Sequence, residues 1–400
     1  MFSRSASFIV AGAAGVATLT ANSAPSPLYP TYQRLWGLSA FTLTVVFAVY
    51  VVALLAALLT VGSLSDQVGR RPVASGALLL LALSMLLFTT ANGSVGLMVA
   101  RTVQGFAVGA ATGTITAMIL DSGSNERSGS IASSAGPSLG SALGAVLAGA
   151  LVDFAPFPRQ LVFWILAPVY LLLAALVWLI PERAKPESAS RSSVWRSLLP
   201  SAGLPSATRP VFFALVPPIV ASFALSGLYL SLGSSVISTV LGVHSPFVAS
   251  IVLGVFFCAG MLGTIVAAFW PPRRTKWFFY GTLMFGVLVT IPAMLMSTLP
   301  LYLLGSAIAG LGTGAALSFA VISLDDAAPA ARRGQVFATM YIVSYVAFSV
   351  PALAAGLAVE RFGLKPTAVV YGACDVALVG VGMMRLVQAR RRSSVGATTG

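Results

Sequence analysis

The amino-acid sequence predicts an all-α integral membrane protein with twelve transmembrane helices, arranged as two parallel six-helix pseudo-repeats. Three observations lead to this fold class. Of the 400 residues, 58% are hydrophobic and only 8% are charged, whereas a soluble domain carries about 25% charged residues. Twelve apolar runs are long enough to cross a bilayer, because a spanning helix needs about 20 residues. A polar stretch divides these runs into two sets of six.

The first six spans form the predicted N-terminal bundle, residues 1–180. Each is an apolar run bounded by charged or turn-forming residues. The first run resembles a signal peptide because Arg4 precedes it, but Pro25 follows the small residues where cleavage would fall. We therefore interpret this run as the first span. The six spans are predicted at 8–28, 41–61, 73–91, 95–120, 130–152 and 160–180.

The second six spans form the predicted C-terminal bundle, residues 210–400. Residues 181–209 are charged and rich in serine and proline, and we expect them to form a cytoplasmic linker between the bundles. The six spans are predicted at 211–240, 247–270, 277–298, 301–323, 335–358 and 366–388.

The distribution of lysine and arginine predicts the orientation in the membrane. If the N-terminus is cytoplasmic, Arg34, Arg159, Arg361 and Lys365 lie outside and Arg101 lies within a span, so that the remaining 18 of the 23 basic residues face the cytoplasm. Both termini are therefore expected in the cytoplasm. This topology accounts for the net charge of +13, and we expect no nucleic-acid partner. The short loops favour a bacterial inner membrane, and we expect a monomer.

An internal repeat relates the two halves. The segment Arg101–Ala111 aligns with Ser306–Ala316 at a shift of 205 residues, and the same shift places Asp121 on Asp326. Span four therefore corresponds to span ten. Two parallel halves of this kind are a known plan of membrane transporters.

The loop after the second span carries the clearest motif. It reads Gly62-Ser-Leu64-Ser-Asp66-Gln-Val-Gly69-Arg70-Arg71-Pro72. All seven specified positions match the loop G-x-L-x-D-x-x-G-R-R/K-P, so the chain resembles the major facilitator superfamily, and in particular its twelve-span drug/proton antiporters. The resemblance implies secondary transport by alternating access.

The resemblance also implies a charge relay at this loop. Asp66 is expected to contact the N-terminus of span eleven near residues 334–335, because a helix N-terminus attracts an anion, and this contact would favour the outward-facing state. The alternative is that the two arginines only anchor the loop at the cytoplasmic surface. The predicted gating residues are Asp66, Gly69, Arg70, Arg71 and Asp121.

Span four contains Arg101 and Gln104 in a segment that resembles the family motif R-x-x-Q-G. An arginine within a span is costly unless it faces protein or water. We interpret Arg101 as a buried cation that senses the substrate or a titrating carboxylate. The alternative is an arginine whose side chain reaches up to the outer interface.

Span five contains Gly136, Pro137, Gly140 and Gly144. These residues resemble the Gly-Pro motif of the family's antiporters, although the expected paired glycines are replaced by Gly140 and Ser141. The motif favours export over import. The alternative is ordinary packing of small residues, which is common between membrane helices.

One acidic residue, Asp375, lies deep within a predicted span. Many proton-driven relatives carry an acid in span one, but span one offers only Asn22 here. Asp375 is therefore the candidate proton carrier. The alternative is a neutral acid that is bonded to a neighbouring helix.

The family fold implies that spans one, four, seven and ten line a central cavity. The candidate lining residues are mostly apolar or aromatic, which suits a lipophilic or amphipathic substrate, although packing or lipid contact could explain each aromatic residue equally well. These candidates are Asn22, Tyr50, Phe223, Tyr229, Tyr341 and Tyr345.

The predicted function is secondary active transport, namely the proton-coupled efflux of a lipophilic or amphipathic small molecule. The alternative is an importer or facilitator of a small metabolite. The sequence contains no P-loop and no HExxH motif, so we expect neither an enzyme nor a metal or cofactor site. A proton gradient would supply the energy.

Overall fold

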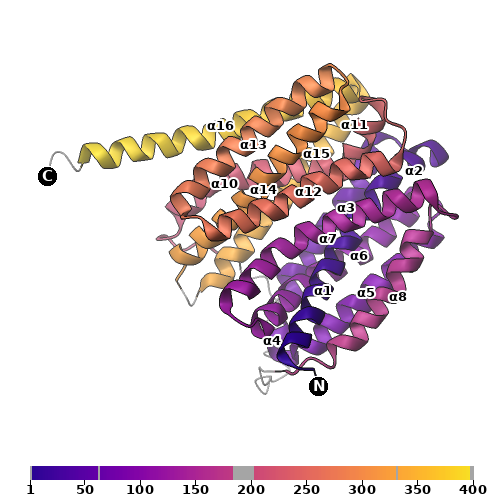
Figure 1. Cartoon of the computed structure of the whole chain (residues 1–400), viewed down its shortest axis with the longest axis horizontal. Helices are drawn as coiled ribbons and strands as arrows, with labels where there is room; N and C mark the ends of the chain where they lie inside the picture. The colour runs from indigo at the N-terminus through magenta and orange to yellow at the C-terminus, as the bar shows by residue number, and fades with distance from the viewer. Residues whose placement is uncertain (1, 62–63, 183–201, 330–331, 397–400) are drawn as a thin grey trace.

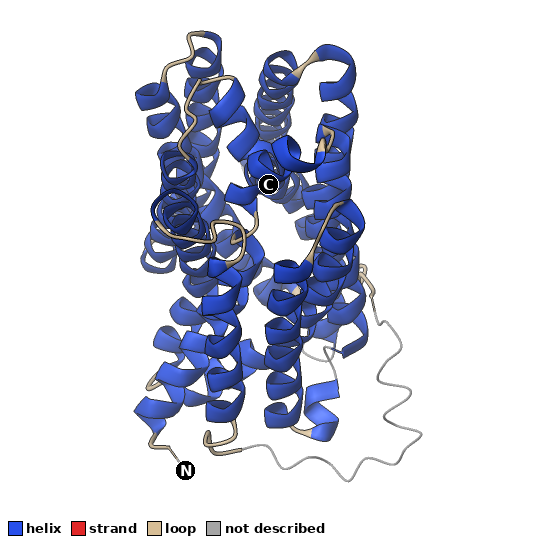
Figure 2. Ribbon diagram, turned by 90° about the vertical axis from the view of Figure 1, so that its right-hand side faces the viewer, coloured by secondary structure: helices blue, strands red, loops and turns tan. Residues whose placement is uncertain are grey.

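The computed structural model describes residues 2–61, 64–182, 202–329 and 332–396, without the side chains of Asp66, Glu126 and residues 386–396. Every regular element in these ranges is helical, and the helices form two bundles (Figures 1 and 2). The N-terminal half contains α1 (Arg4–Ser23), η1 (Ser26–Leu28), α2 (Tyr29–Trp36), α3 (Ala40–Val61), α4 (Leu64–Val68), α5 (Arg70–Thr90), α6 (Ser94–Ser122), α7 (Glu126–Phe154) and α8 (Leu161–Val177).

The C-terminal half begins with α10, after the predicted linker, most of which lies outside the described residues. It contains α10 (Arg209–Leu228), η2 (Tyr229–Gly233), α11 (Ser234–Thr239), α12 (Pro246–Phe269), α13 (Pro272–Leu295), α14 (Leu299–Ala327), α15 (Arg333–Phe362) and α16 (Leu364–Gly396).

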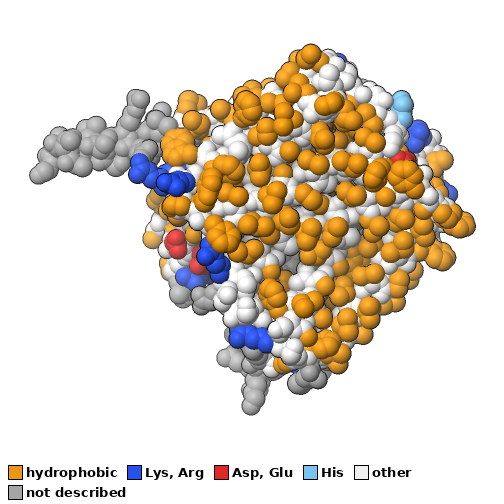
Figure 3. All heavy atoms as spheres, in the orientation of Figure 1, with side chains coloured by type: hydrophobic (Ala, Val, Ile, Leu, Met, Phe, Trp, Pro, Cys, Tyr) orange, Lys and Arg blue, Asp and Glu red, His pale blue; other side chains and the backbone are white. Residues whose placement is uncertain are grey.

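The helices are long and apolar enough for a membrane protein. In the described part of the chain, 11 helical stretches could each cross a bilayer, and the shorter apolar helix Leu161–Val177 takes the place of the predicted sixth span. Its 17 residues extend about 26 Å at a rise of 1.5 Å per residue. Hydrophobic side chains cover much of the face shown in Figure 3, with the charged ones toward the ends. The predicted all-α, twelve-span fold is confirmed.

Three spans differ in detail from the prediction. Helix α1 ends at Ser23 because Pro25 and Pro27 follow, and proline has no N–H group to continue a helix. The chain then forms the short helix α2, where a loop was predicted. Span seven is interrupted by η2, a π-helix. Helix α16 continues beyond the predicted end at residue 388, and its last turns project from the bundle (Figure 1).

Glycine packing shows the internal repeat in three dimensions. A Cβ added at Gly105 on α6 would overlap the carbonyl of Tyr50 on α3, and one at Gly310 on α14 would overlap the carbonyl of Phe256 on α12. The two glycines are 205 residues apart and the two carbonyls are 206 apart. Helix α14 therefore packs on α12 as α6 packs on α3.

The two halves meet along the helix pairs α7–α12 and α3–α15. We call the end of the bundle that carries Arg70, Arg127 and Arg333 the basic end, and the other end, which carries His244, the opposite end. The contacts of α3 with α15 include the rings of Phe47 and Phe348, whose centroids are 4.9 Å apart.

Candidate functional site

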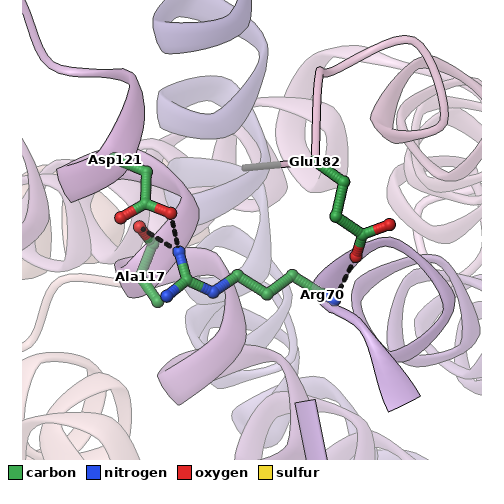
Figure 4. A network of polar contacts seen from close by, with 4 residues as sticks. All are labelled: Arg70, Ala117, Asp121 and Glu182. Carbon is green, nitrogen blue, oxygen red and sulfur yellow. Dashed lines mark hydrogen bonds and ion pairs between the residues drawn. The ribbon is translucent and has the colours of Figure 1, made fainter. Parts of the chain in front are cut away.

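A charged cluster lies at the basic end, where α5 begins (Figure 4). Arg70 forms an ion pair with Asp121 near the end of α6, and it donates a second hydrogen bond to the carbonyl oxygen of Ala117 at 3.2 Å. The side chain of Arg70 is 21% exposed, so protein partly shields the pair from water. The structure therefore brings together two members of the predicted relay.

Glu182, just after span six, completes this cluster. Its carboxylate accepts a hydrogen bond from the backbone N–H of Arg70 at 2.8 Å and lies 4.0 Å from Nε of Arg71, which donates to the carbonyl oxygen of Ile180 at 2.6 Å. A carboxylate is favoured at this helix N-terminus. Gly69 adopts φ 102°, and a Cβ there would lie 2.6 Å from Oε1 of Glu182, so the turn requires glycine.

The predicted contact between Asp66 and span eleven lies outside the described residues, because the side chain of Asp66 is not among them. The first two turns of α15 contact the chain just before α10: the backbone N–H of Gly203 donates to the carbonyl oxygen of Gln335 at 3.4 Å and to Oγ1 of Thr339 at 3.1 Å. The Asp66 contact stays a prediction.

Arg101 lies in the interior of the N-terminal half with 0% of its surface exposed. Its guanidinium group donates hydrogen bonds to the carbonyl oxygen of Asn22 at 3.0 Å, to Oε1 of Gln104 at 2.7 Å and to the hydroxyl of Tyr29 at 2.5 Å. Gln104 in turn donates to the carbonyl oxygen of Ala21 at 2.7 Å. The three acceptors of the guanidinium group are neutral. The alternative in which Arg101 reaches the outer interface is wrong, because the side chain is completely buried.

Aromatic rings enclose the same guanidinium group. Its central carbon lies 5.3 Å from the ring centroid of Tyr50, 5.7 Å from that of Tyr29 and 5.9 Å from that of Phe88. At such distances the electron-rich ring faces attract a cation. Asn22 and Tyr50, both predicted to line the cavity, are only 5% and 1% exposed and pack around Arg101 in this state.

The Gly-Pro segment of α7 packs against α1. A Cβ at Gly140 would overlap the carbonyl of Val16, and one at Gly144 would overlap that of Thr20. Gly136 and Pro137 line a small cavity of about 30 Å³ between α1, α6 and α7. Residues 136–140 also match the hydrolase pattern G-x-S-x-G, but they lie within a continuous helix, whereas a hydrolase nucleophile sits at a strand-to-helix turn.

Asp375 lies within the C-terminal half on α16 and is 4% exposed. Within the described ranges, its Oδ2 atom has no hydrogen-bond partner. Gly372, one turn before it, lines a small cavity together with Tyr229. The hydroxyl of Tyr229 lies 2.6 Å from Oγ of Ser306, the residue that the repeat aligns with Arg101. The C-terminal half thus has a hydroxyl pair where the N-terminal half has a guanidinium group.

The other three predicted lining residues, Phe223, Tyr341 and Tyr345, are partly exposed and lie close together. The ring centroids of Phe223 and Tyr345 are 6.1 Å apart, and those of Tyr341 and Tyr345 are 6.3 Å apart. The ring centroid of Phe348 lies 6.2 Å from that of Phe223. We call Phe223, Tyr341, Tyr345 and Phe348 the aromatic cluster. Tyr229 is not part of it, because it is buried with Phe256 and Tyr302.

Two polar partners were missed by the sequence analysis. Tyr29 follows two prolines in a predicted loop, and nothing in that pattern indicates a buried hydrogen bond. Glu182 had one usable signal, because it is an acidic residue at the end of a span, on the same side as the predicted loop.

Two bundles of membrane-length helices, with a buried guanidinium group in one half and a charged cluster at one end, are typical of a membrane transporter. The family model of the Major Facilitator Superfamily matches residues 11–352, and the chain belongs to this family. A search of curated protein sequences found no match.

Two solved structures show the same fold. A bacterial homologue of the human lysosomal transporter Spinster, in an inward-facing and unoccupied conformation, superposes with a TM-score of 0.75 at 16% identity, covering 96% of this chain and 98% of the other. The human organic anion transporter MFSD10 superposes with a TM-score of 0.65 at 18% identity, covering 96% of this chain and 100% of the other.

Proposed function

We propose that this protein is a proton-coupled exporter of lipophilic or amphipathic small molecules. Asp375 carries the proton-coupling part of the proposal, because it is 4% exposed and its Oδ2 atom has no described partner. It lies about 17 Å along α16 from Leu364 at 1.5 Å per residue. An ionised carboxylate is costly at that depth, so a change in its surroundings would drive the uptake or release of a proton.

Two features support the proposed direction of transport: the glycine motif of α7 and the distribution of basic residues. Gly140 and Gly144 let α7 contact the backbone of α1, as the resemblance to the antiporter motif leads us to expect. The positive-inside rule assigns the basic end to the cytoplasm, with both termini on that side of a bacterial inner membrane. We propose that the substrate is released at the opposite end, and that the protein acts as a monomer.

The substrate class rests on the aromatic cluster and on Arg101. Three of the cluster's four rings, those of Phe223, Tyr341 and Tyr345, are partly exposed and offer an apolar surface, which suits a lipophilic body. The described hydrogen-bond partners of the Arg101 guanidinium are neutral, so its charge remains available to an anionic group if the helices around it part. One structural neighbour is described as an organic anion transporter. Both a lipophilic anion and a lipophilic cation are therefore useful probes.

Transport in proteoliposomes with an imposed pH gradient tests this proposal. We expect the gradient to drive uphill movement of one probe in the wild type, and Asp375→Asn to abolish that movement because an amide cannot carry the proton. The control is Glu360→Gln, which removes an exposed acid at the opposite end and should transport like the wild type.

Two outcomes would contradict the proposal in different ways. If Asp375→Asn remains fully gradient-driven, Asp375 is not the carrier, and coupling would move to Asp66 or Asp121. If the gradient has no effect on either probe, proton-coupled export is wrong, and an importer or facilitator becomes the better description.

A further inference from the structure

A carboxylate of the N-terminal half caps a helix of the C-terminal half at the opposite end of the bundle. Asp153 lies in the last turn of α7, and its Oδ2 atom accepts hydrogen bonds from the backbone N–H of Phe247 at 3.0 Å and from Oγ of Ser245 at 2.5 Å. Ser245 is the N-cap residue of α12, and its Oγ atom accepts from the N–H of Val248 at 3.2 Å. One end of α12 is thus held by the other half of the molecule.

The surrounding packing lets Asp153 reach this position. A Cβ at Gly149, one turn earlier on α7, would overlap Oγ of Ser250 on α12, so only glycine allows the helices to approach this closely. The rings of Phe154 and Phe247 pack edge to face with centroids 5.2 Å apart. Figure 1 shows α7 and α12 side by side along the seam between the halves.

Other contacts between the halves lie at the same end. The hydroxyl of Ser26 donates to the carbonyl oxygen of Leu230 at 2.8 Å, and that of Ser235 donates to Oε1 of Gln33 at 3.0 Å. These contacts join η1 and α2 to the segment from η2 to α11. Of the polar contacts named here, only that of Asp153 brings a full negative charge to the positive end of a helix.

We propose that Asp153 holds the opposite end of the transporter closed, and that its contact with Ser245 and Phe247 breaks each time this end opens. The basic end is expected to have a similar device, since the resemblance places Asp66 at the N-terminus of α15. Asp153 would then be its counterpart at the other end, so that the halves exchange one carboxylate cap for the other. This inference rests on alternating access alone and not on the direction of transport or on proton coupling.

Cysteine accessibility tests this role directly. A cavity of about 510 Å³ borders the contact at Ser245 and includes Ser234, which is 3% exposed and whose hydroxyl has no described partner. Ser234→Cys is therefore a conservative substitution whose thiol reports access to this cavity. It is made in a background in which Cys258 and Cys374 are changed to serine. Asp153→Ala should speed its labelling by an impermeant maleimide about fivefold, because removing a carboxylate from a helix N-terminus costs about as much as removing one capping interaction.

A second reporter separates a shift between states from general loosening. Ser133→Cys lies in the small cavity between α1, α6 and α7, about two turns from the start of α7 at the basic end. If Asp153→Ala favours opening of the opposite end, labelling of Ser133→Cys should fall while that of Ser234→Cys rises. Equal increases at both reporters would mean that the substitution only destabilises the fold, and no change at either would overturn the proposal. Asp153→Asn keeps an acceptor without the charge and should give an intermediate result.

A cross-link provides a test that does not depend on stability. Asp153→Cys with Ser245→Cys places two thiols where the side chains now touch. Oxidation should stop transport of any substrate, and reduction should restore it, because the contact must open in every cycle. Undiminished transport by the cross-linked protein would overturn the proposal, whereas a failure of proton coupling would leave both of these results unchanged.

Discussion

Gly69 and Glu182 show how a single residue supports the charged loop. Gly69 takes a backbone conformation that other residues rarely adopt, and this places the N–H of Arg70 on the carboxylate of Glu182. The loop motif predicted the glycine. It did not predict Glu182, because a contact between residues 112 positions apart leaves no local pattern in the sequence.

We expect Gly69→Ala to destabilise the protein by about 1–3 kcal/mol, the usual cost of a strained backbone conformation. The new Cβ would also displace Glu182 and weaken transport. The control is Gly76→Ala on α5, where an added Cβ meets nothing within 4 Å. Thermal unfolding in detergent measures both variants, and equal melting temperatures would show that the turn is not strained.

Arg101 is held by the geometry of its guanidinium group as well as by its charge. Its acceptors come from α1, α2 and α6, and a planar fork can reach all three at once. We expect Arg101→Lys to reduce transport by at least about tenfold, because each buried acceptor left without a donor costs about 1–3 kcal/mol.

Arg361→Lys, at an exposed position, is the control for this prediction and should behave like the wild type. The measurement is the initial transport rate divided by the amount of folded protein. That amount is taken from the monodisperse peak on a size-exclusion column. Normal transport by Arg101→Lys would show that charge alone is sufficient at this position.

At the scale of helices, apolar runs in the sequence predict well where a helix lies, but they predict poorly where a helix is interrupted. Helix α12 was predicted at 247–270 and runs over Pro246–Phe269. By contrast, neither the end of α1 at Ser23 nor the π-helix Tyr229–Gly233 was predicted. A hydropathy pattern measures how apolar a segment is, and it does not register where the backbone hydrogen bonds change partner.

The α1–α7 pair provides the prediction at this scale. Gly140→Ala should push the two helices apart, because its Cβ would overlap the carbonyl of Val16, and overpacking costs about 1–3 kcal/mol. Gly113→Ala on α6 meets nothing within 4 Å and should be neutral or stabilising by up to about 1 kcal/mol. Thermal unfolding compares the two, and an unchanged Gly140→Ala would mean that the pair tolerates separation.

At the scale of the whole molecule, the sequence repeat predicted a relation that the packing shows. Gly105 and Gly310 occupy matching places against α3 and α12. The functional groups do not repeat, since Arg101 corresponds to Ser306. Symmetry therefore explains the framework of the two halves, and the differences between matched positions are where the chemistry of each half must be sought.

The orientation of the molecule is tested by labelling from one side of the membrane. Ser39 lies at the opposite end and Ser124 at the basic end, and both are exposed. In the background without Cys258 and Cys374, Ser39→Cys should react with an impermeant maleimide on intact cells. Ser124→Cys should react only after the membrane is permeabilised, and the reverse pattern would invert the proposed topology.

The burial of Arg101 also has a consequence for how the protein is made. An arginine opposes insertion by about 2.5–3.5 kcal/mol at the centre of a spanning helix and by less toward its ends, and Arg101 lies about 10 Å from the start of α6. In the folded protein, the atoms that satisfy it include the carbonyl of Asn22 and the hydroxyl of Tyr29, which are synthesised about 75 residues earlier. We therefore expect the first span to remain near the translocon until α6 emerges, so that the two helices enter the lipid together.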